Sequence, residues 1–194
     1  MSVSHDDQAL KNPGRRHFLR VGIAGTAILA TAGITAGVVG FKRVSNQEVA
    51  TGYYLFRPDD VALLTALVPV ILKGSLPEDT SQHPAIIDAI IKSMDDTCMR
   101  LGPPNQKELS QLFDLLNFAP SRRLAAGVKK PWAELADEDI EAFLQRWRHS
   151  SVGLFNAAYR VLTKLASNAY FAMPVSFAIS GYPGPLEHMY NAIN

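Results

Sequence analysis

Apolar side chains recur every three or four residues through most of the chain after residue 58, and this spacing predicts α-helices. No stretch alternates apolar and polar residues for long enough to predict a strand. The expected fold is therefore all-α, a single bundle-like domain of five to six helices. The predicted helices and helical turns cover residues 59–72, 85–101, 105–118, 119–127, 137–149, 152–173 and 175–179.

Capping residues and prolines predict where these helices begin and end. Asp59 is expected to cap the free backbone N–H groups of the first helix, and Asn105 those of the third. Pro174 is expected to end the longest pattern, 152–173, which is apolar around much of its circumference. Such a helix is either central in a bundle or covered by a partner.

The first 41 residues have the pattern of a targeting segment. Arg15-Arg16 is followed by Phe18 and Leu19, which resembles the twin-arginine export signal. The uncharged, Gly- and Ala-rich run 21–41 comes next. A small-residue cleavage site within it predicts removal, whereas its length of 21 residues would also suit an uncleaved membrane anchor. Either way, we expect the twin-arginine translocase as a partner and a periplasmic location.

The rest of the chain, from Lys42 onward, is close to neutral, with 15 Lys and Arg against 16 Asp and Glu. Such a domain lacks the positive field that collects nucleic-acid phosphates, so no nucleic-acid partner is expected. The one cysteine, Cys98, cannot form an internal disulfide. We expect a buried free thiol there, with pairing to a partner chain as the alternative.

The sequence contains no recognisable catalytic or cofactor motif. Phosphate-binding loops, dinucleotide fingerprints, paired cysteines and nucleophile elbows are all missing. The acidic residues of Asp95-Asp96 and 137–139 are interpreted as a solvated face and a helix start. The basic pairs Arg122-Arg123 and Lys129-Lys130 are interpreted as solvated surface, with partner contact as the alternative. We therefore assign no catalytic, cofactor-binding or metal-binding residue and do not expect an enzyme.

Two aromatic segments flank the predicted bundle, and both are candidates for contact with a partner. The segment 42–58 is expected to be an extended aromatic arm before the helical domain 59–194, and it carries Tyr53, Tyr54 and Phe56. At the other end, Gly181-Tyr182-Pro183-Gly184-Pro185 is a stiff piece of backbone. It either covers the bundle or reaches onto another protein, with Tyr182, Pro183 and Pro185 as contact residues. Exposed parts of 152–173 complete the predicted interface.

Several of these features together resemble the gluconate 2-dehydrogenase subunit 3 family. They are the twin-arginine leader, the size of the helical domain, Leu-Thr-Ala-Leu-Val-Pro at 64–69 and the closing Gly-Tyr-Pro-Gly-Pro at 181–185. The resemblance extends loosely from Tyr54 to Pro185. The family's closing motif often lies in a stretch with Trp and Gly, where this chain has Phe177 and Ile179.

The resemblance implies a non-catalytic small subunit of a membrane-associated dehydrogenase. The partner would be a flavoprotein of the glucose-methanol-choline (GMC) oxidoreductase type, which acts on alcohols or sugars, binds FAD and has no export signal of its own. A cytochrome c subunit often accepts the electrons in such complexes. Two alternatives stay open: a stand-alone periplasmic ligand-binding protein or enzyme, and a transient membrane-anchored assembly factor.

Overall fold

The computed structural model describes residues 48–183, so the twin-arginine segment 1–41 and Pro185 lie outside the described residues. In residues 48–183 it contains α-helices and no strand, which confirms the all-α prediction. Short helical turns connect the helices at Thr80–Gln82, Arg122–Ala126 (η2) and Trp132–Glu134 (η3). The α-helices are α3 (Pro58–Ile71), α4 (His83–Met99), α5 (Pro103–Asn117), α6 (Ala119–Ser121), α7 (Asp137–Arg148), α8 (Gly153–Phe171) and α9 (Pro174–Ser180).

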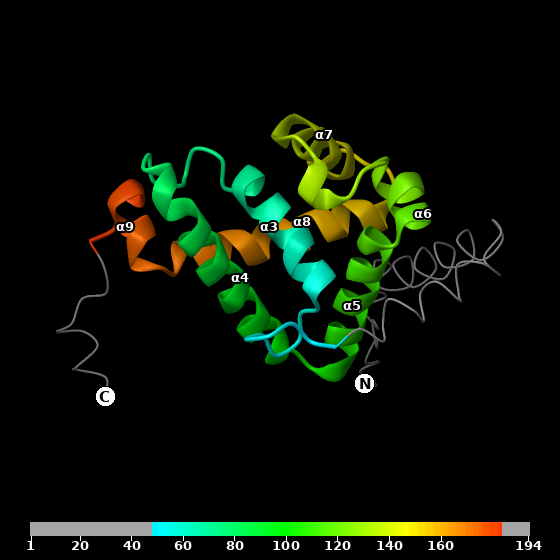
Figure 1. The fold of residues 1–194 in the computed structure, drawn as a ribbon, viewed down its shortest axis with the longest axis horizontal. Coiled ribbons are helices and arrows are strands. Elements are labelled where there is room, and N and C mark those ends of the chain that lie inside the picture. Colours follow the sequence, from blue (N-terminus) through cyan, green and yellow to red (C-terminus); the bar gives the residue numbers. More distant parts are fainter. Residues whose placement is uncertain (1–47, 184–194) are drawn as a thin grey trace, which may run out of the picture. The chain divides into compact units, whose positions relative to one another are not determined.

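Helix α3 lies at the centre of the packing and contacts α4, α5, α7 and α8. Its inward side chains are almost fully buried because neighbouring helices surround them. Figure 1 shows α3 and α4 lying across α8. Helical spacing predicts an inner stripe of Leu63, Leu64, Leu67, Val68, Ile71 and Leu72, and all of these are buried except Ile71, which is partly buried. Val70 is buried as well and lies outside the predicted stripe.

The beginnings of α3 and α5 differ from the predictions. Asp59 does not cap α3, because the helix begins at Pro58 and Arg57 occupies the N-cap position. Asn105 likewise lies inside α5, which begins at Pro103 after Gly102. In both cases a proline takes the first helical position, where its fixed φ suits the helix and its missing N–H costs nothing.

A row of aromatic rings joins α7 to α8 and to the loop before α7. Trp132, Phe143, Trp147 and Phe155 form successive ring contacts with centroids 5.2, 4.8 and 5.0 Å apart. The Trp132 indole N–H donates to the Leu116 carbonyl at 2.9 Å. The Trp147 indole N–H donates to the Ala125 carbonyl at 3.0 Å. Both tryptophans therefore hold the segment between α5 and α7 against the bundle.

Candidate functional site

The described part of the N-terminal arm is a folded loop and not an extended segment. The backbone N–H of Tyr53 donates to the carbonyl of Ala50 at 3.0 Å, and the N–H of Ala50 donates to the carbonyl of Phe56 at 2.9 Å. Gly52 takes a φ of 86°, which glycine adopts without strain. The loop therefore closes on itself immediately before α3.

Asp95 on α4 holds this loop in place. Its carboxylate accepts hydrogen bonds from the backbone N–H groups of Tyr54 at 2.5 Å, Leu55 at 3.0 Å and Phe56 at 2.8 Å. The side chain of Asp95 is buried, whereas its neighbour Asp96 is more exposed and pairs with Arg100 at 2.9 Å. The interpretation of both acids as a solvated face is therefore wrong for Asp95, because the loop folds over it.

The three predicted contact residues of the arm differ in how far they are buried. Phe56 is 1% exposed and packs edge-on against Phe113 at 5.3 Å, so it is a core residue and the expectation of a surface anchor is corrected. Tyr53 is partly buried, and its hydroxyl donates to Asp88 at 3.2 Å. Burial and the Asp88 charge raise the pKa of Tyr53 to about 12. Tyr54 is 69% exposed and remains available to a partner.

A buried ion network lies where the arm joins the bundle. The Arg57 guanidinium donates to Asp60 at 2.8 Å and to Asp114 on α5 at 2.6 Å. The Asn117 side-chain amide donates to Asp60 at 2.8 Å. Burial opposes the charge on Arg57, but the hydrogen bonds to the two carboxylates outweigh it and raise the pKa of Arg57. This network links α3 to α5.

The network was not anticipated from the sequence. The spacing of Arg57 and Asp60, three residues apart, is a local signal that a pairing search would find. Asp114 lies 57 residues away on another helix, and no local signal connects it to Arg57. The network is buried and satisfied, so we interpret it as a structural element and not as a reaction centre.

Helix α8 is buried along one side and exposed along the other. Ala158, Leu162, Ala166, Ala169 and Tyr170 face the bundle. Leu154 and Val161, two turns apart and hence on the same side of the helix, are 53% and 42% exposed. The described domain therefore covers only one side of this helix, and the alternative that a partner covers the other side stays a prediction.

The exposed apolar side of α8 is followed by an exposed α9. Gly181, with a φ of 69°, ends α9 in the left-handed conformation. Tyr182 is 50% exposed and packs edge-on against Phe177 at 5.1 Å, and Pro183 is also exposed. We call the large apolar side chains exposed along this segment the α8–α9 surface: Val152, Leu154, Val161, Phe171, Ile179 and Tyr182.

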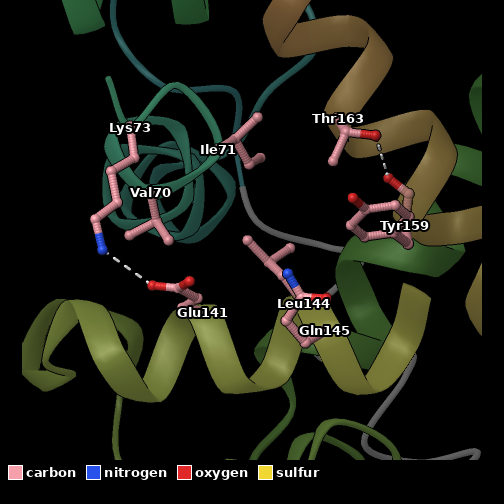
Figure 2. A pocket seen from close by; sticks show the side chains of 8 residues that line it. All are labelled: Val70, Ile71, Lys73, Glu141, Leu144, Gln145, Tyr159 and Thr163. Carbon is pink, nitrogen blue, oxygen red and sulfur yellow. Dashed lines mark hydrogen bonds and ion pairs between the residues drawn. The ribbon is translucent and has the colours of Figure 1, made fainter. Parts of the chain in front are cut away.

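A shallow cleft of about 300 Å³ opens between the end of α3, α7 and α8. Figure 2 shows the Lys73–Glu141 ion pair, 3.1 Å long, at one side of the cleft and Tyr159 with Thr163 at the other. The Thr163 hydroxyl donates to the backbone carbonyl of Tyr159 at 2.8 Å. The residues that line the cleft are Val70, Ile71, Lys73, Glu141, Leu144, Gln145, Tyr159 and Thr163. A small polar molecule is the largest ligand that this space suits.

Cys98 is a buried free thiol, as predicted. Burial, with a smaller contribution from Asp95, raises the pKa of this thiol to about 12, so it stays protonated and unreactive near neutral pH. Within residues 48–183, no group of three or more His, Cys, Asp or Glu side chains is arranged to hold a metal ion. No helix in this part of the chain is long and apolar enough to cross a membrane.

Comparison with known proteins adds no identification to this geometry. No family model, no curated protein and no solved structure matches the chain. The resemblance to the gluconate 2-dehydrogenase subunit 3 family therefore rests on the sequence motifs given above and stays a hypothesis.

Proposed function

We propose that this chain is the non-catalytic small subunit and export escort of a periplasmic, FAD-dependent dehydrogenase of the GMC type. Its twin-arginine signal would carry out of the cytoplasm a flavoprotein that has no signal of its own. The proposal is supported by Arg15-Arg16 with Phe18 and Leu19, and by the resemblance carried by residues 64–69 and 181–185. The substrate, an alcohol or a sugar, would bind to the flavoprotein and not to this chain.

The observation that carries the proposal is the α8–α9 surface. Six large apolar side chains are exposed along α8, along α9 and at the residues that flank these two helices. Single exposed apolar residues are ordinary, whereas several of them along one segment are a candidate interaction site. Aromatic members such as Phe171 and Tyr182 are the kind of side chain that anchors protein interfaces. This surface is therefore where we place the flavoprotein.

Substitutions on the α8–α9 surface test the interface. In the double variant Leu154→Glu/Val161→Glu, charges would be buried at the interface, so the flavoprotein that co-purifies should fall by about tenfold or more. The matched control is Met99→Glu/Leu101→Glu, which changes two exposed apolar residues at the end of α4 and should keep the wild-type yield. Circular dichroism checks that both variants are folded. Equal yields from the two variants would remove this surface from the proposal.

A second experiment tests the export role separately from the interface. Replacing Arg15 and Arg16 by lysine should leave the complex intact but retain both proteins, and the dehydrogenase activity, in the cytoplasm. Cell fractionation with assays for both polypeptides gives the answer. An active flavoprotein in the periplasm of this strain would show that the chain is not its escort. A neighbouring reading frame for a flavoprotein without a signal is the corresponding genomic expectation.

The cleft beside Tyr159 supports one competing function, that of a stand-alone periplasmic ligand-binding protein. At about 300 Å³ it lies at the lower end of the range of ligand sites. This alternative predicts that the purified chain is a monomer that retains a small molecule in native mass spectrometry. It also predicts that Thr163→Leu, which would fill part of the cleft, releases the molecule. A chain purified in fixed stoichiometry with a flavoprotein and without such a molecule would contradict it.

A further inference from the structure

The segment between α5 and α7 carries an excess of positive charge that the proposed function does not use. From Phe118 to Ala133 there are four basic residues and no acidic one. We call residues 122–130 the basic loop, since it contains all four: Arg122, Arg123, Lys129 and Lys130. It consists of the π-helical turn η2, the left-handed Gly127 and residues 128–130, which belong to no helix or strand. π-Helical turns are often found at functional sites.

A cleft of about 250 Å³ lies between the basic loop and α7. Lys129 and Lys130 line it from the loop, and Arg146 lines it from α7. Gly127 makes this arrangement possible, because its φ of 65° and missing side chain let Arg146 lie directly against the loop backbone. A methyl group added at Gly127 would lie 2.1 Å from Nη1 of Arg146. Three cationic side chains are thus gathered at one concave site.

These cations have no acidic partner in the part of the chain that the structure describes. Neither Arg122, Arg123, Lys129, Lys130 nor Arg146 has a carboxylate oxygen within 4.0 Å there. Asp139 also lines the cleft but lies beyond that distance. Elsewhere, exposed cations such as Lys92 and Arg100 do form ion pairs. The cations of the basic loop therefore form no ion pair with the described residues, and Asp139 is the one acidic residue that lines the cleft with them.

Arg122 also lacks a carboxylate partner among the described residues, but unlike the other cations of the basic loop it is buried. Its side chain is 8% exposed, and one guanidinium nitrogen, Nη1, donates to the Asn117 carbonyl at 3.3 Å. Its buried Nε has no hydrogen-bond partner. Burial and the neighbouring Arg123 lower the pKa of Arg122. A buried, incompletely bonded cation is costly, and a nearby anion reduces that cost.

The basic loop is also hydrogen-bonded to the bundle and accessible. The indole of Trp147 bonds the Ala125 carbonyl inside the loop, and the indole of Trp132 bonds the Leu116 carbonyl at the end of α5. Leu124, between the two basic pairs, is 89% exposed, so the tip of the loop projects into solvent. A pre-ordered, projecting loop loses little conformational entropy when a partner binds.

We propose that the basic loop docks an acidic segment of a partner protein, with a carboxylate seated in the cleft between Lys129, Lys130 and Arg146. The concave cleft fits a single carboxylate side chain, and Arg146 can bind it with two parallel hydrogen bonds. A flat anionic membrane is the poorer match, because a membrane-binding face needs several apolar side chains and the tip of this loop has only Leu124. The inference does not depend on the identity of the partner in the proposed function.

A short polyglutamate peptide is the probe, titrated into the full-length chain and followed by tryptophan fluorescence. The two tryptophans of the chain, Trp132 and Trp147, both adjoin the basic loop and report on it directly. We expect saturable binding that weakens as salt is added, and no binding of a polylysine peptide of equal length. Lys129→Glu/Lys130→Glu should weaken binding by about tenfold or more.

The matched control is Lys107→Glu/Lys164→Glu, which makes the same change in net charge at two exposed lysines outside the basic loop. Binding by this control as strong as that of the wild type supports a local site. An equal loss in both variants would mean that only net charge matters and would overturn the proposal. Binding to phosphatidylglycerol vesicles together with no binding of the peptide would also overturn it, in favour of a membrane surface.

Discussion

The carboxylate of Asp95 accepts a hydrogen bond of 2.8 Å from the backbone N–H of Phe56, a residue 39 positions earlier in the chain. Two further backbone N–H groups of the same loop, those of Tyr54 and Leu55, donate to the same carboxylate. A side chain on α4 thus satisfies three donors of a segment that belongs to no helix. The loop is held where its aromatic residues meet the core.

Asp95→Asn should destabilise the domain by about 2 to 3 kcal/mol. The amide keeps the size of the side chain but replaces a charged acceptor by a neutral one, and one of its ends is a donor that faces backbone donors. Urea unfolding followed by circular dichroism measures the change. The neighbour Asp96→Asn is the control, because it disrupts only an exposed ion pair and should cost less than about 1 kcal/mol. Equal costs would contradict the role given to Asp95.

Arg57→Met should be more damaging, by about 3 to 5 kcal/mol, because it leaves Asp60 and Asp114 buried without this cation. The triple variant Arg57→Met/Asp60→Asn/Asp114→Asn should recover much of that stability, since it also removes the two buried charges. Free energies of unfolding for the single and triple variants form the comparison. A triple variant less stable than Arg57→Met would show that the charges are not the source of the cost.

The raised pKa of Tyr53 predicts that the folded domain loses stability at alkaline pH. Its folded-state pKa is raised from 10.0 to about 12, so the folded state holds the phenol proton more tightly than the unfolded chain. Its contribution is therefore complete below pH 10 and is lost as the pH rises towards 12. In Tyr53→Phe this part of the pH dependence should be absent, while that of Cys98, whose pKa is also raised to about 12, should remain. Free energies of unfolding of the wild type and of Tyr53→Phe across this pH window test the prediction. Identical pH profiles of the two proteins would contradict it.

Gly127→Ala should destabilise the domain by about 1 to 2 kcal/mol from its positive φ alone, and further by displacing Arg146. Adding Arg146→Ala should remove the clash but not the backbone strain, so the double variant should recover only part of the loss. Gly153→Ala is the control, because a methyl group at this first residue of α8 meets no atom within 4 Å. Thermal unfolding of the three variants shows how much stability each of them loses. A fully tolerated Gly127→Ala would contradict the geometry of the basic loop.

The helices could be read from the sequence because helical periodicity is a local property. The inner face of α7 is an example: the spacing of Ile140, Phe143, Leu144 and Trp147 predicts that they share one side of the helix, and all four are buried. Spacing alone places such residues on one side of the helix, and the core then covers that side. The helical turn predicted for 119–127 does end at Gly127, and the structure adds that this glycine takes the left-handed conformation.

The errors occurred where residues distant in the sequence meet. Asp95 has the local appearance of a surface acid, and Phe56 that of an arm residue, but the loop folds over one and brings the other onto Phe113. No sequence spacing marks the contact of Asp95 with the loop or that of Phe56 with Phe113.

The amino-acid pattern was thus sufficient for the all-α class, the approximate bounds of the longer helices and the buried state of Cys98. It also supplied the export motif on which the functional proposal depends. The folded structure was needed to show which apolar side chains stay exposed on the α8–α9 surface and which cations of the basic loop form no ion pair with the described residues. Exposure and charge neutralisation both depend on atoms contributed by other helices, and short-range spacing contains no information about them.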